Sequence, residues 1–392
     1  MSMTFNFDHL IDRRGHHSAK WSKVETDELP LWVADMDFQS PPPVIEALEH
    51  AVSHGVFGYP NFGKLPEETI VNWLAERHNW QVDPAHIVLL PGVVAGFNMA
   101  AAAAAQPGEA VLVQPPTYGP FLRVAKNWGL TQQENALLPD ETGRFQVDLD
   151  AFEAAITPET RLFILCNPQN PTGRVFTQAE LEGMAEICLR HDVLICSDEI
   201  HHDLVYRGQE HIPIASLNEE IAANTITLLA PSKTFNIAGL QASAGVIEND
   251  ELRAKFNAQR KGIVEWVNMM GMVAMQTAYA EGGPWLDDLL PYLEENRNLV
   301  VDTVQNKMPG VKMAVPEGTY LAWLDCRGLD MGGYDKNAKL NPFFKEQAGV
   351  VLNNGQWFGT GGEGFVRLNF GCPRPVLQEA LDRMEKAVGQ AG

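Results

Sequence analysis

Short apolar runs separated by helix-forming segments constrain the fold of this chain more than any other feature of its sequence. Each run holds four to six residues that are mostly aliphatic, as in Arg161-Leu-Phe-Ile-Leu-Cys166, and a turn rich in polar residues, proline or glycine often follows. Runs that are apolar along their whole length are typical of strands buried on both faces of a parallel sheet. We therefore predict an α/β fold in which helices cover both faces of a mostly parallel sheet.

Predicted helices alternate with the predicted strands along most of the chain. The strands are 87–90, 110–114, 161–166, 193–197, 226–229 and 243–247. The helices are 43–54, 66–77, 92–105, 119–128, 178–191, 250–258, 264–281 and 285–307. The remaining elements are strands at 312–315, 319–325 and 365–369 and helices at 341–347 and 374–388. This order predicts a large sheet domain followed by a smaller α+β domain.

Lys233 is the single residue that says most about chemistry. It lies in Pro-Ser-Lys-Thr-Phe-Asn-Ile-Ala-Gly-Leu, residues 231–240, directly after the predicted strand 226–229. A buried lysine loses its proton more easily than a solvated one, and the neutral amine is a nucleophile that can form a Schiff base. A solvated surface lysine is the alternative interpretation, and the motif alone does not decide between the two.

Polar side chains follow two other predicted strands. Asn-Pro-Gln-Asn-Pro-Thr-Gly-Arg, residues 167–174, comes after strand 161–166, and Ser-Asp-Glu-Ile-His-His-Asp, residues 197–203, ends the next strand. Carboxylates and amides at these ends point into the crevice where open α/β sheets bind ligands. An ordinary turn and a helix cap are the alternative interpretations of Asn170 and Asp198.

Together these three motifs resemble the fold-type-I enzymes that depend on pyridoxal phosphate, in the class I/II aminotransferase superfamily. Three further blocks, residues 31–38, 56–59 and 365–373, are similar to its cystathionine β-lyase subgroup of the MalY/PatB type. The resemblance covers essentially the whole chain. It implies an aspartate aminotransferase-like fold, with an N-terminal arm at 1–42 that packs on the small domain or on a dimer partner, a large domain at 43–283 and a small domain at 284–392.

The resemblance also implies roles for the residues around the cofactor ring. Lys233 holds pyridoxal 5′-phosphate as a Schiff base and moves protons, and Asp198 pairs with the ring nitrogen. Asn170 donates to the ring 3-oxygen, and His201 lies beside the same oxygen. Tyr118 stacks on the ring face, although a turn aromatic that covers the core is the alternative. Lys233, Asp198 and Tyr118 form the predicted catalytic set.

The phosphate and the substrate have their own predicted partners. Gly92, Val93 and Val94 begin an apolar helix, whose free N–H groups and positive dipole end suit a phosphate. The resemblance adds the hydroxyl of Ser232 and, from the neighbouring subunit of a homodimer, Tyr59. It also implies that Arg367 holds the substrate α-carboxylate, with Asn170 and Tyr118 beside it.

Two positions depart from the family pattern. Ala230 stands where a small Gly or Ser is expected, and Gln241 replaces an arginine that usually contacts the phosphate. The missing cation favours the lyase subgroup, where this arginine is often absent. Trp32, Asp35, Asp37 and Tyr320 are further candidates for the wall of the substrate pocket.

The resemblance implies a carbon–sulfur β-lyase that converts L-cystathionine or another S-substituted L-cysteine to a thiol, pyruvate and ammonia. An aminotransferase acting on an L-amino acid and a 2-oxo acid is the alternative, because both reactions share their first proton transfer. A regulatory binding protein with a secondary lyase activity is a weaker alternative. The preferred sulfur amino acid stays open.

Composition limits the partners and the location. The formal net charge is −21, which disfavours nucleic acid and anionic membranes, so we expect neither as a partner. The five cysteines are odd in number and form no CxxC pair, so we expect a reducing, cytoplasmic setting. We also expect no metal in the site. The polar first residues also predict that there is no signal peptide.

Overall fold

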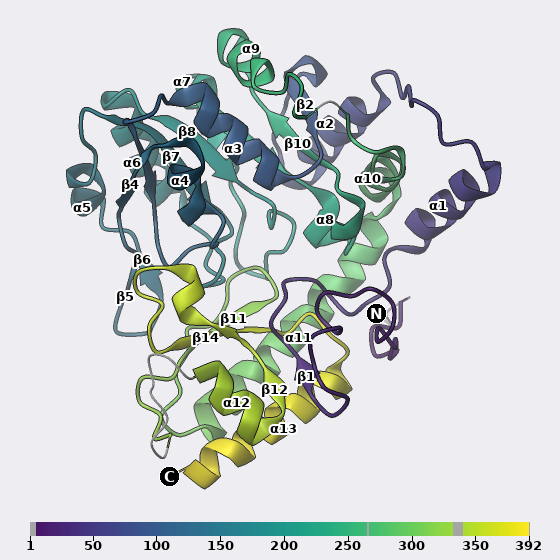
Figure 1. The fold of residues 1–392 in the computed structure, drawn as a ribbon, viewed down its shortest axis with the longest axis vertical. Helices are drawn as coiled ribbons and strands as arrows, with labels where there is room; N and C mark the ends of the chain where they lie inside the picture. The colour runs from purple at the N-terminus through teal and green to yellow at the C-terminus, as the bar shows by residue number, and fades with distance from the viewer. Residues whose placement is uncertain (1–4, 265, 332–339, 392) are drawn as a thin grey trace.

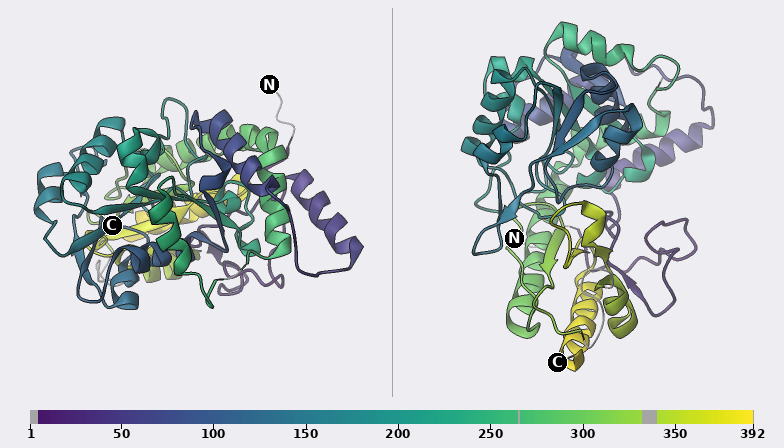
Figure 2. Two further views of the ribbon diagram at one scale, coloured as in Figure 1. Left: turned by 90° about the horizontal axis from the view of Figure 1, so that it is seen from above. Right: turned by 60° about the vertical axis from the view of Figure 1, so that its left-hand side comes forward.

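The computed structural model describes residues 5–264, 266–331 and 340–391. Within these ranges the chain forms an upper and a lower part, in the view of Figure 1, and the long helix α11 (Gly283–Lys307) runs between them. The lower part contains the C-terminal helix and most of the N-terminal segment, which the side views of Figure 2 also show. The predicted domain boundaries near residues 42 and 283 stay a prediction.

The described elements have the following bounds. The strands are β1 (Leu29–Pro30), β2 (Ile87–Leu90), β3 (Ala110–Val113), β4 (Thr131–Glu134), β5 (Leu138–Pro139), β6 (Phe145–Gln146), β7 (Thr160–Cys166), β8 (Leu194–Asp198), β9 (Thr225–Leu229), β10 (Ser243–Val246), β11 (Leu321–Asp325), β12 (Val350–Val351), β13 (Asn353–Asn354) and β14 (Phe365–Asn369). The other helices are α1 (Pro42–His54), α2 (Leu65–His78), α3 (Val93–Ala104), α4 (Val124–Trp128), α5 (Leu149–Ala154), α6 (Gln178–Arg190), α7 (Glu219–Ala223), α8 (Pro231–Thr234), α9 (Asp250–Ala258), α10 (Met269–Glu281), α12 (Leu340–Ala348) and α13 (Arg374–Ala391).

The main sheet lies in the upper part and, over the described residues, has seven strands in the order β2-β10-β9-β8-β7-β3-β4. Only β10 runs antiparallel to its neighbours, so the prediction of a mostly parallel sheet is confirmed. Strands β7, β8 and β9 lie side by side with the same direction. Their carboxyl ends therefore meet at one edge of the sheet, which faces the lower part of the molecule.

Both faces of this sheet are covered, as the continuous apolar runs predicted. In β7, Leu162 and Ile164 pack in the cluster that contains α3, whereas Phe163 and Leu165 pack in the cluster that contains α6. Successive side chains of a strand point to opposite faces, so a strand with apolar residues at every position must be buried on both.

A smaller antiparallel sheet, in the order β11-β14-β13, lies in the lower part. In this sheet Arg367 of β14 is paired with Trp323 on one side and Asn353 on the other. The N-terminal segment is added to this part through β1, which pairs in parallel with β12. Residues 29–30 and residues 350–351 are therefore neighbours in space although they lie far apart in the sequence.

Buried charges fasten the N-terminal segment. The Lys20 ammonium, which is fully buried, lies 2.6 Å from a carboxylate oxygen of Asp37. Arg13 bridges Asp37 and Asp35 at 2.5 and 2.8 Å, and the indole of Trp21 donates to Asp37 at 2.8 Å. Burial alone raises the pKa of Asp37, but Lys20 and Arg13 outweigh that effect and hold the pKa below its ordinary value.

Three expectations about elements were wrong or incomplete. The predicted helix 264–281 begins only at Met269, because the side chain of Asn268 caps it by accepting from Gly271; residue 265 lies outside the described residues. The predicted strand 312–315 is an isolated bridge, since Lys312 meets β11 only at its last residue, Asp325. The predicted helix 119–128 starts as a 3-10 turn before α4.

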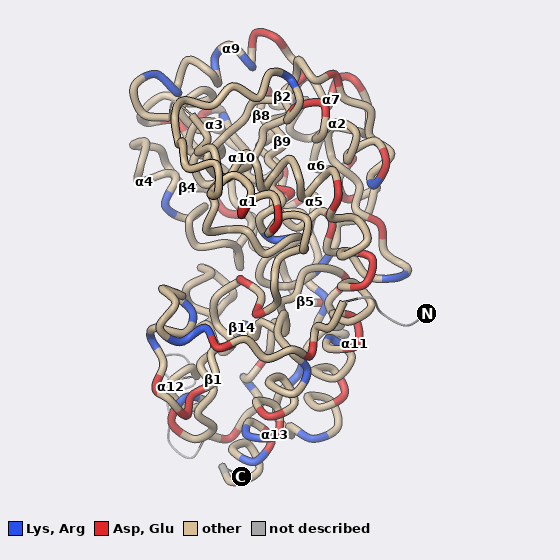
Figure 3. The backbone as a smooth tube through the Cα atoms, turned by 90° about the vertical axis from the view of Figure 1, so that its right-hand side faces the viewer, with Lys and Arg blue, Asp and Glu red and all other residues tan. Residues whose placement is uncertain are grey.

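The surface carries both signs of charge. Figure 3 shows acidic and basic positions interspersed over both parts of the molecule on the face that it presents. Mixed charge of this kind gives no broad basic face for a polyanion. None of the helices in the described ranges combines the length and the apolar character that a bilayer crossing demands.

Replacing Asp37 by Asn should lower the free energy of unfolding by about 3 kcal/mol, because the buried Lys20 ammonium then lacks its closest carboxylate. Urea unfolding at pH 7 measures this difference. The difference in unfolding free energy between Asp37→Asn and wild type should begin to narrow below about pH 4, where the unfolded carboxylate takes up its proton, and should close only below the lowered pKa of the folded carboxylate. Glu251→Gln, at an exposed ion pair with Lys255, is the matched control and should change stability little; an equal loss in both variants would contradict the argument.

Candidate active site

The predicted ring-binding residues meet at the carboxyl edge of β7, β8 and β9. A cavity at this edge is lined by Ala34, Val93, Tyr118, Cys166, Asn170, Asp198, Ile200, His201 and Lys233. All five residues predicted to surround the ring belong to that lining. The site therefore lies where the open sheet of an α/β protein is expected to bind its ligand.

Lys233 reaches this cavity from α8, the single helical turn that follows β9. Pro231 begins the turn, a position at which the missing N–H costs nothing. The Lys233 Nζ donates to the backbone oxygen of Ala34 at 2.5 Å. Burial lowers the pKa of Lys233 to about 8, although Asp35 and Asp198 act in the opposite direction. A large fraction of this amine is therefore neutral near pH 8 and able to act as a nucleophile.

Asp198 is the last residue of β8 and is buried. One hydrogen bond reaches its carboxyl group from the described residues, from the Ile200 N–H at 3.1 Å. Burial raises the pKa of Asp198 to about 7, despite that bond and the charge of Lys233. A carboxyl group with spare acceptor positions and a raised pKa suits a ligand that brings a protonated nitrogen.

Arg367 lies on β14 and is buried next to Asn170, which lines the cavity. Its Nη1 donates to Asn170 Oδ1 at 2.9 Å, and its Nη2 donates to the Trp32 backbone oxygen at 2.7 Å. Among the described residues, its Nε has no hydrogen-bond partner. Burial lowers the pKa of Arg367 to about 10. A buried guanidinium of this kind is suited to the carboxylate of a ligand.

His201 and Tyr118 add two rings to the wall. The Nδ1 atom of His201 has no partner among the described residues, and burial lowers the pKa of this imidazole well below its ordinary value. Its ring meets Tyr320 edge-on at 5.9 Å. The Tyr118 ring lies 5.7 Å from both Phe121 and Trp357, which hold it in an edge-on arrangement beside the cavity. Both rings are therefore fixed by packing before a ligand arrives.

The N-terminus of α3 is the predicted phosphate-binding end. No described side chain caps this helix, so the first-turn N–H groups at Val93 and Val94 stay open. A Cβ atom at Gly92 would meet nothing within 4 Å, which leaves space beside the turn. Ser232 precedes Lys233 in α8, and its role toward a phosphate stays a prediction, as do those of the helix residues.

The two departures from the family pattern lie around α8. Ala230 is buried and stands immediately before the turn. Gln241 is exposed, with a left-handed backbone at a φ of 53°. No hydrogen bond from a described residue reaches the Gln241 side chain, and its effect on phosphate binding stays a prediction.

Tyr59 is not part of the cavity formed by its own chain. Its side chain is 94% exposed and touches Trp266, at a ring distance of 6.2 Å. Of the further pocket candidates, Asp37 serves the buried charge network of the N-terminal segment, whereas the Tyr320 hydroxyl donates to the Ala34 oxygen at 3.1 Å.

Sequence reasoning missed the backbone oxygens of Trp32 and Ala34 as partners of the two site cations. It also missed Cys166 and Ile200 as wall residues, and burial raises the pKa of the Cys166 thiol far above its ordinary value. Every residue has a backbone oxygen, so the type of residue does not indicate which oxygens bind a cation. The only sequence signal for Trp32 and Ala34 is that they lie in the block of residues 31–38.

Comparisons with known proteins agree with this geometry. The family described as aminotransferase class I and II matches residues 26–384. Cystathionine β-lyase PatB of Bacillus subtilis is 42% identical over 98% of this chain and 100% of its own length. Protein MalY of Escherichia coli is 36% identical, over 98% of this chain and 99% of its own.

The structural comparison gives the same family. Cystalysin from Treponema denticola, whose crystal structure contains a pyridoxal 5′-phosphate cofactor, superposes with a TM-score of 0.94 at 33% identity and covers all of both chains. This likeness confirms the predicted fold class. The chain belongs to the class I and II aminotransferase family.

Proposed function

We propose that this chain is a carbon–sulfur β-lyase that depends on pyridoxal 5′-phosphate and cleaves L-cystathionine or related S-substituted L-cysteines. The observation that carries the proposal is the buried Arg367 guanidinium with its unused Nε, next to a cavity that holds the amine of Lys233 and the carboxyl of Asp198. An amino acid substrate needs such a cation beside the reacting centre to bind its α-carboxylate. The relatives named cystathionine β-lyase, over full length, supply the reaction type.

The residues of the cavity fit the cofactor. The Asp198 carboxyl can accept from the ring nitrogen, and the open first turn of α3 can bind the phosphate. The unpartnered Nδ1 of His201 and the amide of Asn170 are available for the ring oxygen. When bound, pyridoxal phosphate supplies an electron sink for the bond that breaks at the substrate α-carbon.

The chain's own residues provide the proton transfers. Arg367 binds the α-carboxylate and thereby sets the α-carbon–hydrogen bond beside Lys233. The neutral Lys233 amine accepts the α-proton, and Asp198 keeps the proton on the ring nitrogen. Lys233 then returns its proton to the sulfur as the β-carbon–sulfur bond breaks. The thiol leaves, and the remaining three-carbon enamine is hydrolysed to pyruvate and ammonia.

An aminotransferase reaction is the runner-up, because the family also bears that name. Up to removal of the α-proton, transamination needs the same arginine for the substrate carboxylate, the same lysine and the same aspartate. The two reactions diverge afterwards, since a lyase expels the sulfur group without a 2-oxo acid. The difference is therefore visible in the products.

The chain forms a homodimer with itself in this proposal. Large apolar side chains that are exposed in the single chain gather in two segments, at Val56, Phe57, Tyr59, Ile263 and Trp266. The Tyr59 and Trp266 rings are in contact, which joins the two segments into one patch. Several large apolar side chains exposed side by side are typical of a protein–protein interface. A second copy that covers it brings Tyr59 toward the phosphate of the partner's site.

The location follows from the cysteines. All five are free and buried. Burial raises the pKa of each thiol, which keeps it protonated and slow to oxidise. Free thiols without a disulfide favour a reducing compartment, and the enzyme acts in the cytoplasm.

Cofactor-loaded protein incubated with L-cystathionine and no 2-oxo acid should release pyruvate and homocysteine in equal amounts. Lys233→Ala should lower this rate at least about 100-fold, because it removes the group that takes the α-proton. Lys126→Ala, at an exposed lysine, is the matched control and should behave as wild type. Product formation only after a 2-oxo acid is added would overturn the lyase assignment in favour of transamination.

Arg367→Lys should lower kcat/KM for an S-substituted L-cysteine by about 10- to 100-fold, since a point charge replaces the paired donors of the guanidinium. The α-carboxamide of the same substrate should show a much smaller difference between variant and wild type. Steady-state kinetics with both substrates measure this contrast. An equal loss for the carboxylate and the carboxamide would show that Arg367 acts on something other than the carboxylate.

Tyr59→Ala and Lys233→Ala should each be poorly active alone and should complement each other when the two chains are mixed and reassembled. A mixed dimer then has one intact site, and about a quarter of wild-type activity is expected. Size-exclusion chromatography with light scattering verifies the dimer. If Tyr59 served the site of its own chain, no mixed dimer would contain an intact site and activity would not return.

A further inference from the structure

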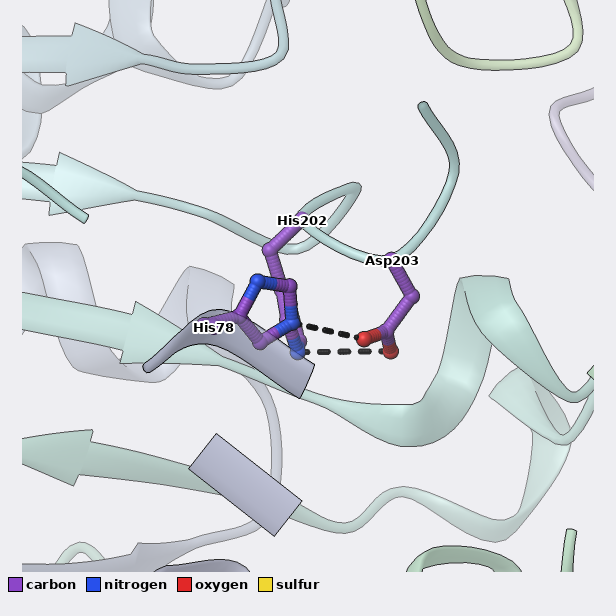
Figure 4. Close-up of side chains that lie close together, drawn as sticks. All are labelled: His78, His202 and Asp203. Carbon is purple, nitrogen blue, oxygen red and sulfur yellow. Dashed lines mark hydrogen bonds and ion pairs between the residues drawn. The ribbon is translucent and has the colours of Figure 1, made fainter. Parts of the chain in front are cut away.

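A second cluster of ionisable side chains lies apart from the catalytic cavity. It joins His78, the last residue of α2, to His202 and Asp203 in the turn that follows β8. His202 and Asp203 are buried, and His78 is partly buried. Figure 4 shows that both imidazole rings point toward the carboxylate of Asp203. The proposed reaction uses none of these three side chains.

The spacing of the three side chains matches a small metal site. The His78 Nε2 lies 2.9 Å from Asp203 Oδ1, and the His202 Nε2 lies 3.3 Å from Asp203 Oδ2. All three ligand atoms lie within 4.8 Å of one another. Ligand atoms around a tetrahedral zinc ion are about 3.4 Å apart, so small ring rotations would bring the set to bonding geometry.

The hydrogen bonds of His202 leave a lone pair aimed at the cluster. Its Nδ1 lies 2.7 Å from the backbone oxygen of Glu199, which can only accept, so Nδ1 carries the proton of the neutral ring. Its Nε2 is buried and has no hydrogen-bond partner among the described residues. This nitrogen therefore faces Asp203 Oδ2, acceptor against acceptor, and a cation bound by both atoms would satisfy the nitrogen.

Outer contacts hold the Asp203 carboxylate in place. The Trp73 indole donates to Oδ1 at 2.9 Å, and the Thr234 hydroxyl donates to Oδ2 at 2.7 Å. Metal-binding carboxylates and imidazoles are usually oriented by such second contacts, which also include the Glu199 oxygen on His202. Asp203 and His202 are thus oriented by contacts within the protein.

The surroundings admit a hydrated cation. A cavity of about 210 Å³ adjoins the cluster and is lined in part by His78, His202, Asp203 and His211. The positive charge of Arg77, which also lines it, is balanced by Asp287 at 2.6 Å. A fourth ligand position can therefore be filled by water from this cavity.

We propose that His78, His202 and Asp203 bind a divalent transition-metal ion of the zinc type, with water as the remaining ligand. Two imidazoles and one carboxylate are a ligand set that zinc, nickel and cobalt accept, whereas magnesium and calcium prefer oxygen ligands. Sequence reasoning predicted no metal, because His78 and Asp203 are 125 residues apart and form no local motif. The proposed ion site is close to α8. The hydroxyl of Thr234, which donates to Asp203, belongs to the residue that directly follows Lys233 in this helix.

The test uses the cofactor-loaded full chain, stripped with EDTA and titrated with ZnCl₂ by isothermal calorimetry. Wild type should bind one equivalent per chain, and Co²⁺ at the same site should show visible d–d absorption. His202→Ala and His78→Ala should each weaken binding by more than the about 10- to 100-fold that follows loss of an outer contact. Circular dichroism and the retained cofactor absorption verify that each variant is folded.

A double variant, His50→Ala with His54→Ala, is the matched control. These two exposed histidines lie one turn apart on α1, where they could bind zinc adventitiously, and their loss should leave the tight equivalent unchanged. The proposal is overturned if wild type takes up no tight equivalent, which would mean that a second proton on His202 satisfies Asp203. It is also overturned if only the double variant loses binding, or if His202→Ala and His78→Ala both bind as wild type does.

Discussion

The structure depends on the burial of three ionisable groups, Lys233, Asp198 and Arg367, around one cavity. Removal from water lowers the pKa of the two cations and raises that of the carboxyl group. Lys233 and Asp198 are thereby brought to pKa values of about 8 and about 7, near which each can exchange a proton, whereas Arg367, with a pKa of about 10, stays charged and able to bind a carboxylate. Burial of this kind costs stability, and the apolar packing of the elements around these groups offsets it.

The N-terminal segment completes this environment through its backbone. Its oxygens at Trp32 and Ala34 accept from Arg367 and Lys233, so two cations are solvated by peptide groups instead of water. Asn369 holds the segment by donating to the oxygens of Val33 and Asp35. The buried ion pair between Lys20 and Asp37, on either side of residues 32–35 in the sequence, fastens the same segment. The geometry at the reacting centre therefore depends on contacts that touch no ligand.

Much of this arrangement could be predicted, and the parts that could not share a physical reason. β2 matches its predicted range because a continuous apolar run signals a strand buried on both faces, and β14 matches its range although Arg367 interrupts its apolar residues. β4 was missed because Thr131–Glu134 is polar and lies at the edge of the sheet, where only one neighbour is needed. The lysine, aspartate and arginine of the site have side-chain signatures, whereas backbone acceptors and the His78–Asp203 cluster exist only after folding brings distant segments together.

The pairing of the first segment with the last strands bears on the order of synthesis. A chain leaves the ribosome from its N-terminus, and a completed sheet domain can begin to fold while translation continues. Here the segment around Ala34 finds its partners, β12 and Asn369, only when almost the whole chain has been made. During translation it stays unpaired beside a nearly finished core. A nascent chain that stops before β14 would therefore contain the amine of Lys233 but neither its solvating oxygen in place nor the guanidinium for the substrate.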